Sequence, residues 1–216
     1  MLTEQEQKLV DELSKPFYGV PESAEILTRD GWKNCDDLVV GEQVLTFNRE
    51  SQILEWQPCL TKHRFPFDQE ILRFRSDSRL WIGPKRDFRF THEHRWPVRI
   101  GDGSSISLVE GQDLNSNHSF IAQESEDGWL DWLPFDAGTI TSEHYKGRVW
   151  CTTTDNGTWV MRQNGGIVIT GNNPVGDDCR DEWGAYNDEY DEEFNSQRVV
   201  TDPPSDTDAS AASAQE

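Results

Sequence analysis

Short apolar runs separated by polar turns recur along most of the chain. The runs that we interpret as strands cover residues 25–28, 38–40, 43–48, 53–56, 60–65, 71–74, 80–82, 88–98, 106–108, 120–122 and 129–133. Turn-forming pairs such as Asp30-Gly31 and Gly41-Glu42 lie between them. Short strands with turns every ~8–12 residues are typical of all-β domains. The pattern therefore predicts an all-β fold, either a sandwich or a barrel-like sheet.

The pattern is clearest between residues 148 and 174. Three apolar runs, 149–154, 159–161 and 167–169, follow one another, and Asp155-Asn156-Gly157 separates the first two. Because an Asn or Asp before Gly is a hairpin signal, the stretch predicts three consecutive strands. Cys151 lies on the first strand, and Thr170-Gly171-Asn172-Asn173 follows the last. These residues are candidates either for packing or for chemistry.

Both ends of the chain depart from the β pattern. Residues 1–18 begin with a capping-box sequence at Thr3 to Glu6 and carry apolar residues on one helical face until Pro16, which predicts a short helix. Residues 173–216 contain thirteen acidic residues and two arginines. That composition cannot offset the entropy of ordering, so we expect disorder. The expected organisation is a flank (1–18), a β domain (19–172) and an acidic flank (173–216).

Composition narrows the functional classes. The formal net charge of −20 disfavours sequence-independent binding to nucleic-acid phosphates or anionic membranes, and no apolar run is long enough for a membrane helix. Only 34% of the residues are hydrophobic, but nine Trp and ten Phe allow a compact core over part of the chain. Four irregularly spaced cysteines without a CxxC motif predict a reducing compartment, so we expect a cytoplasmic location. We also expect a monomer.

Three blocks of the sequence together resemble the self-splicing inteins of the Hint (Hedgehog/intein) fold. They are residues 23–32 with 36–45 (SAEILTRDGW, DDLVVGEQVL), residues 91–96 (THEHRW) and residues 148–174. The resemblance covers about residues 19–172. It implies a horseshoe-shaped, all-β Hint fold that acts on its own flanking segments without a cofactor, in a bacterial or phage-infected cell. The short stretch before the third block shows no endonuclease-like helix, so the resemblance is to a mini-intein.

The second block resembles the TxxH motif of inteins through Thr91 and His94. In that family the histidine donates to the amide nitrogen of the bond before the first intein residue, and the threonine helps to fix the strained peptide. Protonating a leaving nitrogen is general-acid catalysis, so the resemblance makes His94 the acid and Thr91 its partner. The alternative is a surface histidine at a strand end. His92 and His94 would share a strand face, but no partner cluster at zinc spacing accompanies them, so we expect no metal.

The first block places the first intein residue at Gly19, which makes Tyr18–Gly19 the N-terminal junction. Glycine carries no nucleophile. However, Cys151 lies where most inteins have Asp, and with Trp96 and Thr170 it resembles the Trp-Cys-Thr triad of class 3 inteins, which lack a first-residue nucleophile. The resemblance implies that Cys151 attacks the Tyr18 carbonyl to form a thioester, in surroundings shaped by Trp96 and Thr170. The alternative for Cys151 is a small buried apolar residue.

At the other end of the domain, Asn172 resembles the terminal asparagine of inteins, whose side chain cyclises and cuts the following bond. Gly171 would permit the backbone geometry that this step needs. It also stands where many inteins have a histidine, and the histidine usual after the first strand of this block is absent too, which predicts slow cyclisation. Asn173 carries no thiol or hydroxyl to accept an acyl group. The sequence therefore favours cleavage at both junctions over splicing of the flanks.

Two hypotheses of different classes follow. In the first, residues 19–172 are a single-turnover self-processing domain, and residues 1–18 and 173–216 are segments of an interrupted host protein. In the second, the domain is a Hint-like scaffold without activity that serves as a binding or structural module with its acidic tail. The chemistry of Cys151 discriminates between them.

Overall fold

The protein is described from a computed structural model, which covers residues 18–76, 86–101, 103–123, 130–135 and 139–172. These residues belong to one compact unit. They form strands β1 to β14 and the short 3-10 turn η1 (Gly111–Asp113), which confirms the predicted all-β class. The predicted helix at the N-terminus, the strand at 80–82 and the disordered tail from residue 173 lie outside the described residues.

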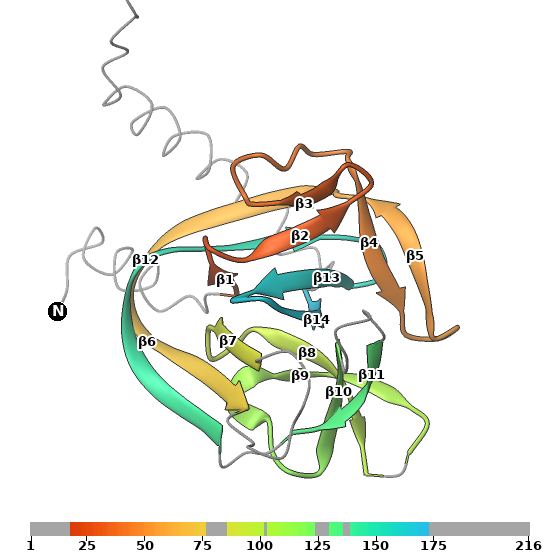
Figure 1. Ribbon diagram of the computed structural model, residues 1–216, viewed down its shortest axis with the longest axis vertical. Coiled ribbons are helices and arrows are strands. Elements are labelled where there is room, and N and C mark those ends of the chain that lie inside the picture. Colours follow the sequence, from red (N-terminus) through yellow and green to blue (C-terminus); the bar gives the residue numbers. More distant parts are fainter. Residues whose placement is uncertain (1–17, 77–85, 102, 124–129, 136–138, 173–216) are drawn as a thin grey trace, which may run out of the picture. The chain divides into compact units, whose positions relative to one another are not determined.

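The strands form two antiparallel sheets (Figure 1). In order, the first sheet contains β1 (Val20–Pro21), β12 (Ile140–Thr153), β6 (Thr61–Ser76) and β7 (Arg86–Phe90). The second contains β5 (Ile53–Pro58), β4 (Gln43–Asn48), β2 (Glu25–Thr28), β13 (Thr158–Gln163), β14 (Gly166–Gly171), β10 (His118–Gln123), β8 (Arg95–Ile100) and β9 (Ile106–Glu110). At its margins β3 (Gly31–Lys33) pairs with β2, and β11 (Leu130–Pro134) pairs with β10.

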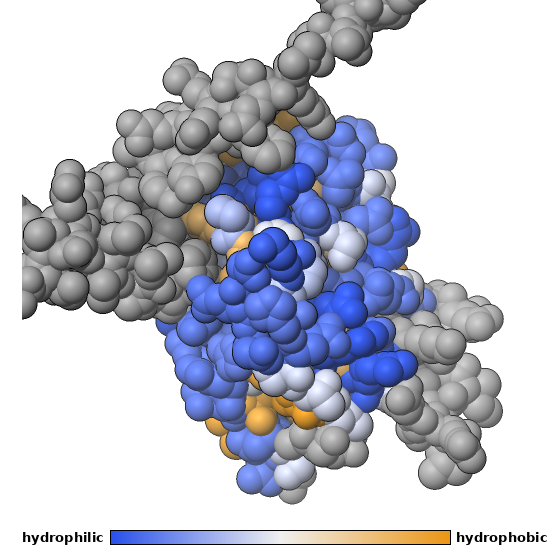
Figure 2. All heavy atoms as spheres, turned by 90° about the vertical axis from the view of Figure 1, so that its left-hand side faces the viewer, coloured by the Kyte–Doolittle hydropathy of each residue, from blue (hydrophilic) through white to orange (hydrophobic). Residues whose placement is uncertain are grey.

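Strands β6 and β12 run side by side as a long curved ribbon (Figure 1), paired without a break from Ile140↔Phe74 to Thr153↔Thr61. The prediction of two separate strands at 60–65 and 71–74 was therefore wrong. The polar middle of β6 does not end the strand, because its side chains face outward. There Asp68 forms an ion pair of 2.7 Å with Lys146 of β12. The described part of this face is accordingly mostly hydrophilic (Figure 2).

Two further strand predictions need correction. The run 88–98 is not one strand, since β7 ends at Phe90, β8 begins at Arg95, and a turn closed by a hydrogen bond from the His94 N–H to the Thr91 carbonyl (3.1 Å) lies between them. The run 38–40 is a loop. The Leu38 N–H donates to the Asn34 carbonyl and the Val39 N–H to a Glu42 carboxylate oxygen, so local hydrogen bonds replace strand pairing there.

The core is built largely from aromatic side chains. The larger cluster includes the fully buried Trp96, Trp150 and Trp159, together with Phe88, Phe90 and Phe120. A smaller cluster contains Phe47, Ile121, Val160 and Ile169. Each large ring removes much apolar area from water, which is how a chain of low hydrophobic content maintains a packed domain. Strands β8, β12 and β14, which carry the candidate triad, contribute to the larger cluster.

Candidate functional site

Thr91 binds both the backbone N–H and the backbone carbonyl of Gly19. The Gly19 N–H donates to Thr91 Oγ1 at 3.0 Å, and the Thr91 N–H donates to the Gly19 carbonyl at 3.0 Å. Thr91 is fully buried in the turn between β7 and β8. The Tyr18–Gly19 peptide bond is therefore fixed by the threonine of the TxxH turn.

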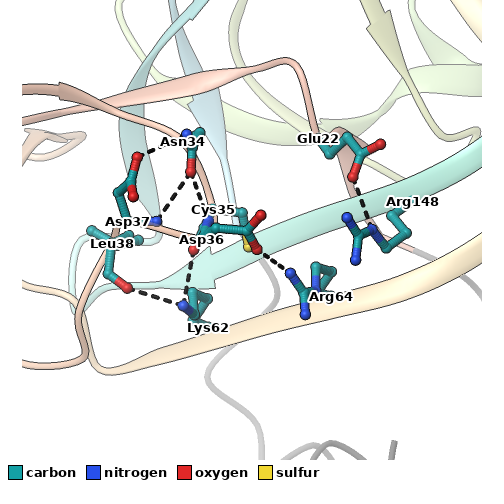
Figure 3. Close-up of polar contacts among 9 residues, drawn as sticks. All are labelled: Glu22, Asn34, Cys35, Asp36, Asp37, Leu38, Lys62, Arg64 and Arg148. Atoms are coloured by element: carbon teal, nitrogen blue, oxygen red, sulfur yellow. Dashed lines mark hydrogen bonds and ion pairs between the residues drawn. The ribbon is translucent and has the colours of Figure 1, made fainter. Parts of the chain in front are cut away.

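The chain after Gly19 runs antiparallel to β12. Val20 pairs with Trp150, and Glu22 is held by Arg148 through a backbone hydrogen bond of 3.0 Å and a side-chain ion pair of 2.8 Å (Figure 3). A Cβ at residue 19 would lie only 3.0 Å from the Trp150 carbonyl oxygen. Glycine allows this close approach, so the junction lies against the residue that precedes Cys151.

The loop around Cys35 is held by side chains at the beginning of β6 (Figure 3). The Lys62 ammonium donates to the carbonyls of Cys35 (2.9 Å) and Leu38 (3.0 Å), and Arg64 pairs with Asp36. Cys35 is buried here, and burial raises the pKa of its thiol to about 12. A protonated thiol is a weaker nucleophile than a thiolate.

Tyr18, the residue before the junction, contacts Arg95. The guanidinium carbon of Arg95 lies 5.6 Å from the centroid of the Tyr18 ring, within the range of a cation–π interaction. The backbone of Arg95 also packs on Gly171, where a Cβ would meet the Arg95 carbonyl oxygen at 2.6 Å. Arg95 therefore contacts the chain beside both predicted junctions.

His94, Thr170 and Trp96 form one contiguous cluster. His94 Nε2 and Thr170 Oγ1 are 2.5 Å apart, and the His94 ring stands edge-on to Trp96 with centroids 5.9 Å apart. All three residues are buried. Burial lowers the pKa of His94 to about 3, because a buried imidazolium loses its hydration. A neutral imidazole can offer an N–H group but no charge.

Cys151 lies on β12, the strand that pairs with the chain after Gly19. It lies on β12 directly after Trp150, which Gly19 approaches, and its Sγ donates to the Thr152 carbonyl at 3.5 Å. Its partner across the sheet is His63 of β6. Strand pairing therefore places Trp150, the neighbour of Cys151, beside the predicted N-terminal junction, whereas direct side-chain contacts join His94 to Thr170 and to Trp96.

Asn172 lies at the end of β14 and is 2% exposed. Its side-chain Nδ2 donates to the carbonyl and to Oγ1 of Thr154, both at 3.3 Å, and its N–H donates to the Gly157 carbonyl at 3.1 Å. Gly171 has no positive φ. Glycine is needed there for the close approach to Arg95 rather than for an unusual backbone conformation, which corrects the expectation from the sequence.

Two features of this arrangement escaped the sequence reasoning. Thr154 holds the Asn172 amide, and a threonine directly before the Asp155-Asn156-Gly157 turn was the only available signal. Arg95 contacts Tyr18, but its position next to the TxxH histidine says nothing about the direction of its side chain. Both contacts depend on residues that are distant in sequence.

The described residues show no group of three or more His, Cys, Asp and Glu side chains that could hold a metal ion. His92 and His94 lie in the turn before β8 rather than on a strand, so the expectation that they share a strand face was wrong. Within the described part of the chain, no helix is long and apolar enough to cross a membrane.

No protein-family model matches the sequence, and no curated protein matches it. Solved structures do match. The AceL NrdHF class 3 split intein, in a GSH-linked splice-inactive variant, superposes with a TM-score of 0.60 at 15% identity over 73% of this chain and 100% of that chain. A KlbA intein precursor from Methanococcus jannaschii gives 0.54 at 13% identity over 75% and 95%. A DnaB intein from Synechocystis sp. PCC 6803 gives 0.52 at 14% identity over 72% and 99%.

The chain has the Hint fold of inteins. The matches cover nearly the full length of those inteins and about three quarters of this chain. At such low identity they show the fold alone, so the chemistry of the Hint domain must be argued from its own residues.

Proposed function

We propose that residues 19–172 form a self-processing domain of the intein type, which cleaves its own backbone at Tyr18–Gly19 and at Asn172–Asn173. The observation that carries the proposal is the pair of hydrogen bonds between Thr91 and Gly19. A buried threonine that binds both polar groups of one glycine holds a defined peptide bond beside a cysteine-bearing strand. In the proposed mechanism the domain is its own substrate and acts once.

At the N-terminal junction, the Cys151 Sγ attacks the carbonyl carbon of Tyr18. A thioester forms between Tyr18 and Cys151, the Tyr18–Gly19 bond breaks, and the proton of the thiol ends on the Gly19 nitrogen, which becomes an amine. Thr91 orients the peptide bond. His94, neutral because of its burial, supplies a hydrogen bond to the leaving nitrogen, and the proton passes to that nitrogen as the bond breaks. Water or an added thiol then releases residues 1–18.

The environment of this step supports a class 3 mechanism. Trp96 and Thr170, the proposed partners of Cys151, both contact His94. The most similar of the three reported structures is a class 3 intein whose splice-inactive variant carries Cys→Ala and Asn→Ala substitutions. The two substituted positions of that variant are separated by nearly the same number of residues as Cys151 and Asn172.

At the C-terminal junction, the Nδ2 of Asn172 attacks its own main-chain carbonyl carbon. The Asn172–Asn173 bond breaks, Asn172 becomes a succinimide, and the proton lost from Nδ2 equals the one gained by the Asn173 amine. The hydrogen bonds to Thr154 restrict the rotation of the Asn172 side chain. Asn173 has no nucleophile for the thioester, so the expected products are three separate fragments rather than ligated flanks.

Mass spectrometry of the purified full chain tests the proposal. With dithiothreitol at pH 7, fragments 1–18 and 173–216 should accumulate over hours to days. Cys151→Ala should abolish release of 1–18, and Asn172→Ala should abolish release of 173–216. Cys35→Ala is the matched control, since Cys35 is also a buried cysteine, and it should still release both. A folded wild-type chain that stays intact with and without thiol would establish the inactive scaffold instead.

A further inference from the structure

The side-chain oxygen of Asn172 is an unsatisfied acceptor. While Nδ2 makes both of its hydrogen bonds to Thr154, Oδ1 is buried and has no hydrogen-bond partner among the described residues. A buried carbonyl without a donor is costly. This unsatisfied oxygen belongs to the side chain that reacts in the proposed C-terminal cleavage.

Arg49 carries a second unsatisfied polar atom close to the same place. It follows Asn48, the last residue of β4, in the turn toward β5, and its Nε is buried without a hydrogen-bond partner in the described part of the chain. Gly157 lies near both side chains. A Cβ at residue 157 would be 3.6 Å from Asn172 Oδ1 and 3.9 Å from Arg49 Nη2. An unsatisfied donor group and an unsatisfied acceptor therefore border one glycine.

Because residue 157 is glycine, no side chain from this residue occupies the space near Asn172 Oδ1. Its φ of +69° strains any residue with a side chain, so no residue at 157 can supply a general acid to Asn172. Gly171 cannot supply one either, because a Cβ there would collide with the Arg95 carbonyl oxygen. The only charged group among the three nearest neighbours of the open position is the guanidinium of Arg49.

We propose that Arg49 activates Asn172 for cyclisation. This inference rests on the proposed function and names the group that replaces the two histidines missing from the C-terminal junction. When Nδ2 loses its proton, negative charge develops mainly on Oδ1 of the amide. The Arg49 guanidinium, which like Oδ1 lies near Gly157, stabilises that charge in a buried site, where an electrostatic interaction is strong. Thr154 meanwhile holds Nδ2. Arg49 neither gives up nor takes up a proton in this step, so the proton balance of the cleavage is unchanged.

The test compares release of fragment 173–216 from the full chain in the wild type, Arg49→Gln and Arg49→Lys. Arg49→Gln should slow this release by about hundredfold to thousandfold, the range for removal of one charge-stabilising donor. Arg49→Lys should recover most of the rate, since it retains the charge. Release of 1–18 should stay at the wild-type rate in both variants. Arg99→Gln is the matched control, because Arg99 also has a buried Nε without a hydrogen-bond partner in the described residues.

The pH profile separates activation from a structural role. If Arg49 favours loss of the Nδ2 proton, the C-terminal cleavage of Arg49→Gln should recover as the pH rises, and added guanidinium at millimolar concentration should accelerate it. An Arg49→Gln chain that is folded by circular dichroism and releases 173–216 at the wild-type rate overturns the inference alone. A wild-type chain that never releases 173–216, with 1–18 released normally, overturns the C-terminal part of the proposed function together with the inference.

Discussion

His94 Nε2 lies 2.5 Å from Thr170 Oγ1, although 76 positions separate the two residues in the chain. His94 belongs to the turn that holds Gly19 through Thr91, and Thr170 lies two residues before Asn172 on β14. One hydrogen bond therefore joins the structure around the N-terminal junction to the strand that leads to the C-terminal junction. In a buried cluster such a bond has no competition from water.

Replacing Thr170 with valine should slow the N-terminal cleavage by about tenfold or more, because the imidazole loses the partner that fixes its orientation and tautomer. Valine keeps the shape of threonine, so the free energy of unfolding should fall by only about 1–3 kcal/mol, the cost of an unsatisfied buried group. Thiol-induced release of 1–18 and urea denaturation measure the two effects. Thr141→Val, at an exposed position on β12, is the control and should change neither.

Acid should destabilise the domain through His94. The unfolded chain binds a proton at His94 below pH 6.5, whereas burial lowers the folded pKa to about 3. Between these values the unfolded state binds more protons, so stability falls as the pH falls, by about 1.4 kcal/mol for each pH unit. The pKa values of His63 and His118 are also lowered by burial.

The difference between two variants isolates the His94 contribution. Urea denaturation of a cleavage-blocked Cys151→Ala, Asn172→Ala chain between pH 6.5 and 5, with and without His94→Gln, gives that difference. The chain with His94 should show the steeper loss of stability on acidification. Equal slopes would mean that the imidazole is protonated in the folded domain.

Gly19 and Gly171, the glycines beside the two predicted junctions, should differ in their tolerance of alanine. A Cβ would lie 2.6 Å from the Arg95 carbonyl oxygen at Gly171 but 3.0 Å from the Trp150 carbonyl oxygen at Gly19. Because backbone atoms yield less than side chains, overpacking of this kind costs about 1–3 kcal/mol. Gly171→Ala should lower the free energy of unfolding more than Gly19→Ala does in the same cleavage-blocked background. The reverse order, measured by urea denaturation, would contradict the packing found at these positions.

The contact between Arg95 and Tyr18 should make the N-terminal junction sensitive to an aromatic residue at position 18. Tyr18→Phe retains the ring face and should cleave at nearly the wild-type rate, whereas Tyr18→Leu should release fragment 1–18 about two- to fivefold more slowly, which corresponds to about 0.5–1 kcal/mol for a cation–π interaction. Arg95→Gln should remove the difference between Phe and Leu. Equal release from Tyr18→Phe and Tyr18→Leu in the wild-type background would exclude a role for this contact.

Substituting a nucleophile at position 173 should convert cleavage into splicing. A thiol directly after the scissile Asn172 can accept the acyl group from the Cys151 thioester before Asn172 cyclises. The Asn173→Cys chain should therefore yield a product in which residues 1–18 are joined to 173–216, detectable by its mass. Asn173→Ala, which has no nucleophile, should give separate fragments. If Asn173→Cys also gives only fragments, the two junctions do not come close enough for acyl transfer.

The fold class could be predicted from the sequence, because strand alternation and Asx-Gly turns are local signals. Strand lengths could not. β6 runs through the polar residues around Asp68 because β12 pairs with it along its whole length, and this pairing is a long-range interaction. Likewise, the run 88–98 divides at the Thr91–His94 turn, where Thr91 binds Gly19, a residue distant in sequence.

The sequence by itself determined the residue types that the proposed chemistry needs, namely a cysteine on a strand, the TxxH pair and an asparagine after the last strand, because motif spacing is preserved in the linear chain. Only the tertiary structure decided their partners: Thr170 for His94, Thr154 for Asn172, and Arg95 for Tyr18. Each of these contacts joins elements that are distant in sequence. Direction, burial and closeness of side chains arise when the sheets pack, and no local pattern encodes them.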